Sequence, residues 1–177
     1  MHVKAKKMAV GGLMLALTEV CIALGSVMEA NTLFFLAAAS FFVGIIIREM
    51  EVRAGAAFYI AGVLLGILVS PNKLYVISYA AMGFYILAIE IVYKRLGTFK
   101  GNINRRVLFW VFKYALFNLI FIPGVLLFQK ILFAREQPSV VLAGVLAAGQ
   151  IGLWIYDRSY EYIQGNIWNK IRGRLLG

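Results

Sequence analysis

The stretch that decides the fold is residues 8–28, MAVGGLMLALTEVCIALGSVM. It is almost wholly apolar, and a basic cluster flanks it on the N-terminal side only. An α-helix needs about 20 apolar residues to cross the roughly 30 Å hydrocarbon core of a bilayer. Small residues recur along the stretch at Ala9, Gly12, Ala16 and Ala23. The stretch therefore predicts a first membrane-spanning helix with one side suited to close contact with another helix.

The composition of the whole chain also indicates a membrane protein. Hydrophobic residues make up 62% of the 177 residues, charged residues make up 15%, and the mean hydropathy is +0.84. A soluble domain is about half apolar and about a quarter charged. We expect an all-α integral membrane protein in which residues 1–177 form a single membrane domain, with six transmembrane helices in one bundle. The predicted spans are residues 8–28, 32–47, 54–70, 73–93, 107–128 and 139–156.

Lys and Arg are distributed unevenly between the two sides of this predicted bundle. With six spans both termini lie on one side, and most of the basic residues fall there, while the other side has only Lys73, Lys130 and Arg135. Cytoplasmic loops carry an excess of Lys and Arg. We therefore predict that both termini are cytoplasmic. The net charge of +10 is then a signal of topology, and we expect no nucleic-acid partner.

The tail, residues 157–177, has a different pattern from the spans. Apolar residues recur at spacings of three and four, at Tyr160, Ile163, Ile167 and Ile171, and Lys170, Arg172 and Arg174 lie among them. This pattern is typical of an amphipathic helix that lies in the membrane interface. A simple extension of the sixth span beyond the bilayer is the alternative, and the sequence leaves both open.

Residues for catalysis or metal binding are scarce. The chain contains no G-x-S-x-G, H-E-x-x-H or G-x-x-x-x-G-K-[ST] motif. Cys21 is the only cysteine and lies within a span, and His2, in the N-terminal segment, is the only histidine. A nucleophile–base pair or a thiolate metal cluster cannot be assembled from these residues. We expect that the chain is not an enzyme and that it uses no metal and no other cofactor.

Two charged residues inside the predicted spans lie at similar depth. Glu90 is near the cytoplasmic end of the fourth span, and Lys113 is about two turns into the fifth span from the same side. A charge that is removed from water needs a partner of opposite sign. We predict that Glu90 and Lys113 form a structural ion pair.

Three further polar residues are expected near the midplane, each on a different span: Glu19, Asn118 and Gln150. They are candidates for the floor of a cavity. For Asn118 and Gln150, a hydrogen bond between helices is an equally good interpretation. A charge on Glu19 would require a cation or several hydrogen-bond donors, which favours a functional role for this residue.

Polar residues at the outer links, with tyrosines just beneath them, complete the candidate site. Aromatic rings with a few placed polar groups suit a small-molecule site. Membrane-interface aromatics and solvated loop residues are the alternative interpretation. The candidate substrate-binding residues are Glu19, Asn31, Asn72, Tyr75, Tyr79, Asn118 and Gln150.

Several short patterns resemble one family of membrane proteins. They are Gly12-x-x-x-Ala16 within GGLMLALTEV, the glycine-rich third span, the turn Ser70-Pro71-Asn72, and the run AAGQIG at residues 147–152. Together with the six spans, these patterns resemble the substrate-binding S components of energy-coupling factor (ECF) vitamin transporters. The resemblance implies a multi-pass protein of the bacterial cytoplasmic (inner) membrane that captures a small water-soluble nutrient in the outer half of its bundle.

The resemblance also implies partners. S components dock through small residues of the first helix onto a transmembrane T subunit, which couples them to two ATPase subunits. Gly12 and Ala16 are the corresponding docking residues here, although Gly replaces the Ala that is usual at the first position. The alternative function is a non-transporting membrane scaffold of the bacterial envelope, of the MreD type.

The first span contains an unresolved conflict between docking and ligand binding. Glu19 lies on the same helical stripe as Gly12 and Ala16, because these positions follow spacings of three and four. One stripe cannot easily face both a docked partner and an internal ligand. The sequence leaves open which of the two Glu19 faces.

Overall fold

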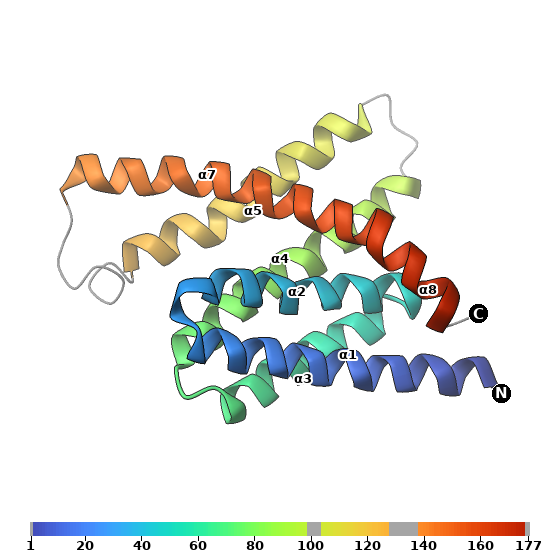
Figure 1. Ribbon diagram of the computed structural model, residues 1–177. Helices are drawn as coiled ribbons and strands as arrows, with labels where there is room; N and C mark the ends of the chain where they lie inside the picture. The colour runs from blue at the N-terminus through green and yellow to red at the C-terminus, as the bar shows by residue number, and fades with distance from the viewer. Residues whose placement is uncertain (1, 99–103, 128–137, 176–177) are drawn as a thin grey trace. The chain divides into compact units, whose positions relative to one another are not determined.

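The computed structural model describes residues 2–98, 104–127 and 138–175, and its elements are helical (Figure 1). In chain order they are α1 (His2–Val27), η1 (Glu29–Asn31), α2 (Thr32–Glu49), α3 (Val52–Val69), α4 (Lys73–Thr98), α5 (Arg105–Leu127), α7 (Ser139–Tyr162), η2 (Ile163–Trp168) and α8 (Asn169–Leu175). The described residues contain no strand. Within these described ranges, six helices are long and apolar enough to cross a membrane, which confirms the all-helical class and the composition of a multi-pass membrane protein.

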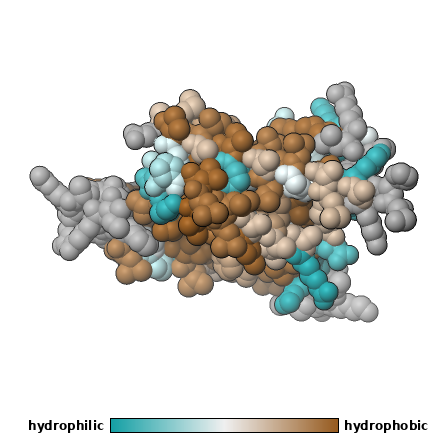
Figure 2. All heavy atoms as spheres, turned by 90° about the horizontal axis from the view of Figure 1, so that it is seen from below, coloured by the Kyte–Doolittle hydropathy of each residue, from teal (hydrophilic) through white to brown (hydrophobic). Residues whose placement is uncertain are grey.

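Large apolar side chains are exposed along these helices, as expected for surfaces that face lipid. Leu13, Leu64 and Leu68 are examples from α1 and α3. Figure 2 shows hydrophobic side chains over the middle of the visible face. A soluble monomer rarely exposes a continuous apolar area of this kind.

The chain divides into two compact units. Unit 1 comprises Met1–Phe99 and Ile163–Gly177, and unit 2 comprises Lys100–Tyr162. A single bundle of all six helices stays a prediction.

Helix α2 is the centre of unit 1 and packs against α1, α3 and α4. Its residues Leu36, Val43 and Ile47 are fully buried. A helix that is apolar on all sides is typically an interior helix, because it has no polar face to turn toward water. The sequence of α2, TLFFLAAASFFVGIIIRE, has this character.

Glycines on α3 allow the neighbouring helices to approach closely. A Cβ at Gly55 would lie 2.1 Å from Cγ1 of Ile47 on α2, and one at Gly62 would lie 2.5 Å from the hydroxyl of Tyr79 on α4. Small residues at helix contacts are the usual way for membrane helices to pack tightly. The glycines of the glycine-rich third span therefore lie against α2 and α4 inside unit 1.

Unit 1 has two ends, which we name after a residue at each. At the Ser26 end, the hydroxyls of Ser26 and Ser70 are 2.8 Å apart, which ties the end of α1 to the turn between α3 and α4. The side chain of Asn72 accepts a hydrogen bond from the backbone N–H of Leu74 at 3.0 Å. This contact satisfies one of the free N–H groups at the start of α4.

At the opposite Glu49 end, two lysines bind the last carbonyls of α2. Lys7 donates to the carbonyl of Glu49 at 2.6 Å, and Lys94 donates to the carbonyl of Ile47 at 3.1 Å. Cations are favourable at a helix C-terminus because the free carbonyls concentrate negative partial charge there. These lysines therefore attach α1 and α4 to the end of α2.

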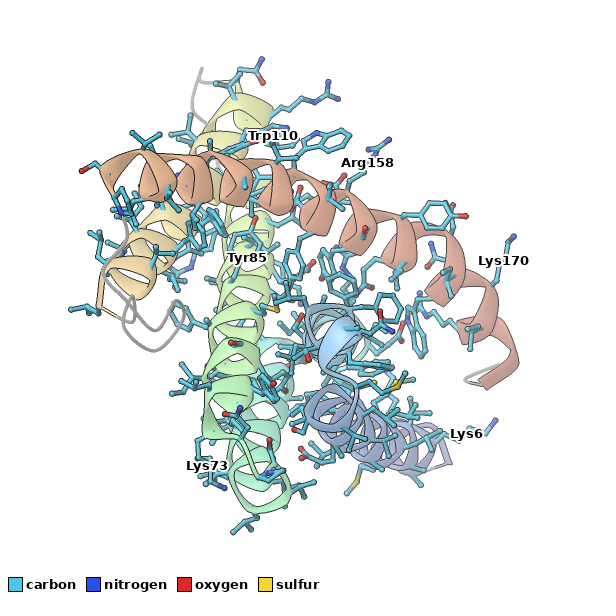
Figure 3. The ribbon with its side chains drawn as sticks, turned by 60° about the vertical axis from the view of Figure 1, so that its left-hand side comes forward. Lys6, Lys73, Tyr85, Trp110, Arg158 and Lys170 are labelled. Atoms are coloured by element: carbon cyan, nitrogen blue, oxygen red, sulfur yellow. The ribbon has the colours of Figure 1, made fainter. Side chains whose placement is uncertain are left out.

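The C-terminal tail also binds α2 at the Glu49 end. The Glu49 carboxylate accepts from Nε1 of Trp168 at 3.0 Å and pairs with Nε of Arg172 at 2.8 Å. Both chain ends therefore lie at the same end of unit 1 (Figure 1). The apolar side chains of Ile167 and Ile171 remain 43% and 41% exposed, and Lys170 points away from α8 (Figure 3). Whether this apolar side meets the membrane interface stays a prediction.

Candidate functional site

Glu19 is the only charged residue in the interior stretch of α1. Both oxygens of its carboxylate are buried, and neither has a hydrogen-bond partner among the described residues. The neighbouring Thr18 behaves differently, because its hydroxyl donates to the carbonyl of Met14 at 2.9 Å. An ionised carboxylate without a partner is costly to remove from water. Packing alone therefore does not explain why a carboxyl group occupies this position of α1.

Tyr79 on α4 is the second polar residue without a hydrogen-bond partner in this region. Its side chain is 0% exposed, and its hydroxyl lies against Gly62, where the absence of a Cβ leaves room for it. The hydroxyl has no hydrogen-bond partner in the described part of the chain. A buried hydroxyl in this state costs free energy, since it has lost its bonds to water.

Glu19 and Tyr79 belong to one cluster. Ile22, one turn after Glu19, is fully buried in the same apolar group as Tyr79. We call these two side chains the Glu19–Tyr79 cluster, and it places three oxygens without hydrogen-bond partners among apolar side chains.

A second tyrosine, Tyr59 on α3, forms part of the wall of this cluster. Its ring centroid is 6.5 Å from that of Tyr79, with an angle of 42° between the ring planes. Its hydroxyl donates to the carbonyl of Ala80 at 2.9 Å, so its hydrogen-bonding capacity is used. Tyr59 is not among the site residues predicted from the sequence, although its helical spacing from Gly62 places both on one face of α3.

The remaining outer candidates lie nearer the Ser26 end. Tyr75 is partly buried and packs against the apolar group that contains Tyr79. Asn31 and Asn72 are exposed, and Asn72 is used as the helix cap of α4. Ser26 and Ser70, which link the helices at this end, were not selected from the sequence. Lys130 and Arg135, predicted to lie on the same outer side, fall outside the described residues.

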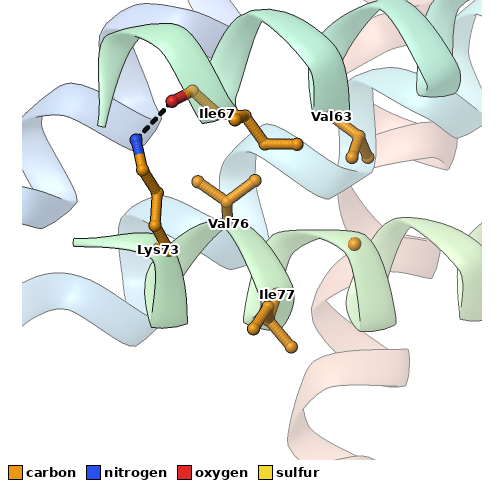
Figure 4. A pocket seen from close by; sticks show the side chains of 6 residues that line it. Val63, Ile67, Lys73, Val76 and Ile77 are labelled. Carbon is orange, nitrogen blue, oxygen red and sulfur yellow. Dashed lines mark hydrogen bonds between the residues drawn. The ribbon is translucent and has the colours of Figure 1, made fainter. Parts of the chain in front are cut away.

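A groove of about 300 Å³ lies between α3 and α4 near the same end (Figure 4). Its lining residues are Val63, Ile67, Lys73, Val76, Ile77 and Ala80. The ammonium of Lys73 is held at one edge by the carbonyls of Ile67 and Ser70, the latter at 2.9 Å. The groove is otherwise apolar, so it offers little polar recognition of a water-soluble ligand.

In unit 2, Asn118 on α5 and Gln150 on α7 bind each other. The amide of Gln150 donates to Oδ1 of Asn118 at 2.7 Å, and the amide of Asn118 donates to Oε1 of Gln150 at 3.3 Å. Asn118 also donates to the carbonyl of Tyr114 at 2.9 Å. The structure thus shows the interhelical hydrogen bond that was one of the two interpretations of these residues.

The two charged residues Glu90 and Lys113, predicted to pair with each other, each have another partner inside their own unit. Glu90 accepts two hydrogen bonds from the guanidinium of Arg48, at 2.5 and 3.0 Å. Lys113 pairs with Asp157 at 2.8 Å and with Glu161 at 3.1 Å. Asp157 was assigned to the tail, but α7 continues to Tyr162 and keeps it on the helix.

The predicted docking residues Gly12 and Ala16 lie on an exposed part of α1. Beyond its chain neighbours and the backbone of its own helix, no atom of the described residues lies within 4 Å of where a Cβ on Gly12 would be. The stripe changes toward the Ser26 end, where Glu19 and Ala23 are partly buried. The stripe on α1 is therefore exposed at Gly12 and Ala16 and partly buried against the other helices of unit 1 at Glu19 and Ala23.

The chain offers no group of three or more His, Cys, Asp or Glu side chains suited to a metal ion, within the residues that the structure describes. Comparisons with known protein families, curated proteins and solved structures found no match. The geometry of the Glu19–Tyr79 cluster and of the open face of α1 therefore carries the functional argument.

Proposed function

We propose that the chain is the substrate-capture (S) subunit of an ECF-type importer in the cytoplasmic membrane of a bacterium. It binds a small water-soluble nutrient and delivers it with a transmembrane T subunit and two ATPase subunits. The observation that carries the proposal is the division of α1. One half has an open face at Gly12 and Ala16, and the middle has the buried Glu19 carboxylate without a hydrogen-bond partner. A scaffold needs only the open face, whereas a docking subunit that binds a ligand needs both.

The charge distribution supports an orientation for this function. Lys7, Arg48, Lys94 and Arg172 all take part in contacts near the Glu49 end. By the positive-inside rule this end faces the cytoplasm, so the Ser26 end faces the outside. A nutrient would then enter from the Ser26 end toward the Glu19–Tyr79 cluster, while Gly12 and Ala16 dock on the T subunit nearer the cytoplasm.

Docking is tested by co-expressing the chain with the T subunit and ATPases of an ECF module and purifying through the T subunit. Wild type should co-purify. Gly12→Leu should lower the amount bound by about tenfold, because tight helix contacts leave no room for the larger side chain and a loss of 1.4 kcal/mol suffices. The matched control is Gly152→Leu, since a Cβ at Gly152 on α7 also meets no atom within 4 Å. Equal retention of both variants would count against the docking face.

Substrate capture is tested by native mass spectrometry of the purified chain and by uptake of a panel of radiolabelled water-soluble vitamins. We expect a bound small molecule, and uptake only when the ECF module is present. Uptake without the module would overturn the proposal. A scaffold of the MreD type would instead purify empty and give no uptake with or without the module.

A further inference from the structure

We propose that the groove between α3 and α4 binds an anionic phospholipid, with the phosphate at Lys73 and the first part of one acyl chain along the groove. The groove lies at the Ser26 end of unit 1 and has a volume of about 300 Å³. Among the described residues that line it, Lys73 is the only charged one, and the other five are apolar. A charged edge that leads into an apolar groove has the same order of groups as a phospholipid. The site does not depend on the proposed transport function.

The groove follows the two helices from the end of the span toward its interior. Lys73 is the first residue of α4, and Ala80 lies two turns further on, roughly 10 Å along the axis at ~1.5 Å per residue. On α3, Ile67 is near the C-terminal end and Val63 lies one turn deeper. An acyl chain that starts at Lys73 therefore points into the hydrocarbon core, as the chains of the surrounding bilayer do.

The groove has a buried floor and is open at its sides. Val76 is 3% exposed and lies against Gly66 of α3, where a Cβ would be 3.4 Å from Cγ1 of Val76. Ile67 and Ile77 line the groove but remain 45% and 51% exposed. Lipid tails are as apolar as these side chains, so the groove adds packing contacts and a defined position for the chain rather than a hydrophobic driving force. The headgroup must therefore supply most of the selectivity.

The ammonium group of Lys73 is held at the edge of the groove with one donor left. It donates to the carbonyl of Ile67, as Figure 4 shows, and to the carbonyl of Ser70 at 2.9 Å. An ammonium group has three N–H donors, so the third is available to a ligand. Lys73 is exposed, and no carboxylate among the described side chains forms an ion pair with it. An anion can thus bind Lys73 without breaking a contact of the protein.

The start of α4 adds to the attraction for a phosphate. The helix is 26 residues long and has no acidic residue in its first turn. A helix N-terminus carries a positive partial charge, which favours phosphate groups. Basic sites at the ends of membrane helices bind anionic headgroups for the same electrostatic reason. A zwitterionic headgroup brings its own ammonium to the same place, and this offsets the attraction.

The test uses the full-length chain purified in a neutral detergent, with dioleoylphosphatidylglycerol and dioleoylphosphatidylcholine as probes. These lipids have the same acyl chains and differ in the headgroup. Native mass spectrometry during a lipid titration gives the dissociation constant of the first bound lipid. We expect the wild type to bind phosphatidylglycerol about tenfold more tightly than phosphatidylcholine, as one hydrogen bond to a charged group can provide. Equal binding of the two lipids would overturn the proposal.

Variants of Lys73 locate the headgroup. Lys73→Gln should remove the preference for phosphatidylglycerol, whereas Lys73→Arg keeps the charge and should keep the preference. The matched control is Lys170→Gln, which removes an exposed cation at the opposite end of unit 1 and should bind as wild type (Figure 3). A preference that survives in Lys73→Gln contradicts the site. An equal loss in both Gln variants also contradicts it, because the lipid would then be attracted by the overall charge of the protein.

The groove is tested without changing any charge. Ala80→Leu places three more carbon atoms in the groove and should weaken phosphatidylglycerol binding about threefold, through lost packing contacts. Ala57→Leu adds the same side chain at an exposed position of α3 outside the groove and should bind as wild type. Wild-type binding by Ala80→Leu would show that the lipid does not occupy the groove. Inorganic phosphate at the concentration of the lipid should not displace it, and displacement would identify a free anion as the ligand instead.

Discussion

Units 1 and 2 both contain polar side chains that pair with each other, but unit 1 also contains polar groups without a hydrogen-bond partner among the described residues. Between α5 and α7, Lys113 is paired with two carboxylates and Asn118 is bonded to Gln150. In α1–α4, the carboxylate oxygens of Glu19 and the hydroxyl of Tyr79 are buried and have no hydrogen-bond partner among the described residues. Polar groups that satisfy each other stabilise a structure, whereas groups that are kept unsatisfied cost stability and need another reason to be present. The polar pairs of unit 2 have a structural explanation, whereas the unsatisfied groups of unit 1 are the reason for proposing that this unit binds a ligand.

The largest effect should come from removing the buried cation of unit 2. Lys113→Leu leaves Asp157 buried without its counter-charge, and we expect a loss of about 3–5 kcal/mol in the free energy of unfolding. The measurement is reversible denaturation from mixed micelles. The double variant Lys113→Leu/Asp157→Leu should recover part of this loss, since it removes both charges. A loss below about 1 kcal/mol in the single variant would show that the ion pair behaves as a solvent-exposed pair, and the contrast between the two units would lose its evidence from unit 2.

A smaller loss of unfolding free energy is expected when a methyl group is added beside a buried aromatic ring, and its size should differ between the two units. A Cβ at Gly62 would meet the Tyr79 hydroxyl at 2.5 Å, and a Cβ at Gly149 would meet the Phe121 ring at 2.2 Å. Tyr79 is fully buried, while Phe121 is partly exposed and has room to move. We expect Gly62→Ala to cost about 1–3 kcal/mol in unfolding free energy, and Gly149→Ala to cost less, because overpacking is costly only where neighbours cannot shift. The reverse order would show that the surroundings of Tyr79 yield more easily than those of Phe121, contrary to their burial.

The amide pair of unit 2 should contribute about 1 kcal/mol. Hydrogen bonds between membrane helices average well below their value in apolar solvents, because the unfolded chain in the membrane also finds partners. A double-mutant cycle with Asn118→Leu and Gln150→Leu measures the coupling directly. A coupling free energy near zero would mean that the two amides do not stabilise each other. The other interpretation of Asn118 and Gln150, that they line a cavity, would then be favoured.

The smallest effect on stability is expected at Glu19. Because its oxygens have no hydrogen-bond partner to lose, Glu19→Gln should change the unfolding free energy by no more than about 0.5 kcal/mol, or should raise it. The same denaturation assay gives the value. A loss of about 2 kcal/mol or more would show that Glu19 has a structural partner and would end the contrast between the units.

Much of the fold follows from local sequence. The apolar runs predict six helices because each can satisfy its own backbone hydrogen bonds in lipid only as a helix. Pro71 and Asn72 predict the break before α4, and the Asn72 side chain caps that helix. The end of α7 was less predictable. Its helix passes the last apolar residues and continues through Asp157 to Tyr162, since backbone hydrogen bonds do not stop where hydropathy falls.

The candidate site was only partly visible in the sequence. Glu19 stands out because ionisable residues are rare in membrane helices, and Tyr79 was one of several tyrosines near the predicted outer side. The rotation of α1 and α4 about their axes decides which of these residues meet. It places Tyr75 beside the apolar group of Tyr79 and leaves Asn72 at the helix end as a cap. Apolar periodicity is weak in helices that are hydrophobic on most sides, so it does not define that rotation.

The sequence by itself determined the class of the protein, the number of apolar helices and which residues are unusual among them. Only the tertiary structure decided the partners: Arg48 for Glu90, Asp157 and Glu161 for Lys113, and Trp168 and Arg172 for Glu49. It also left Glu19 and Tyr79 without hydrogen-bond partners in the described chain. The reason is physical: helix formation depends on nearby residues, whereas the pairing of charges depends on which helices meet, and contacts between residues far apart in the chain decide that.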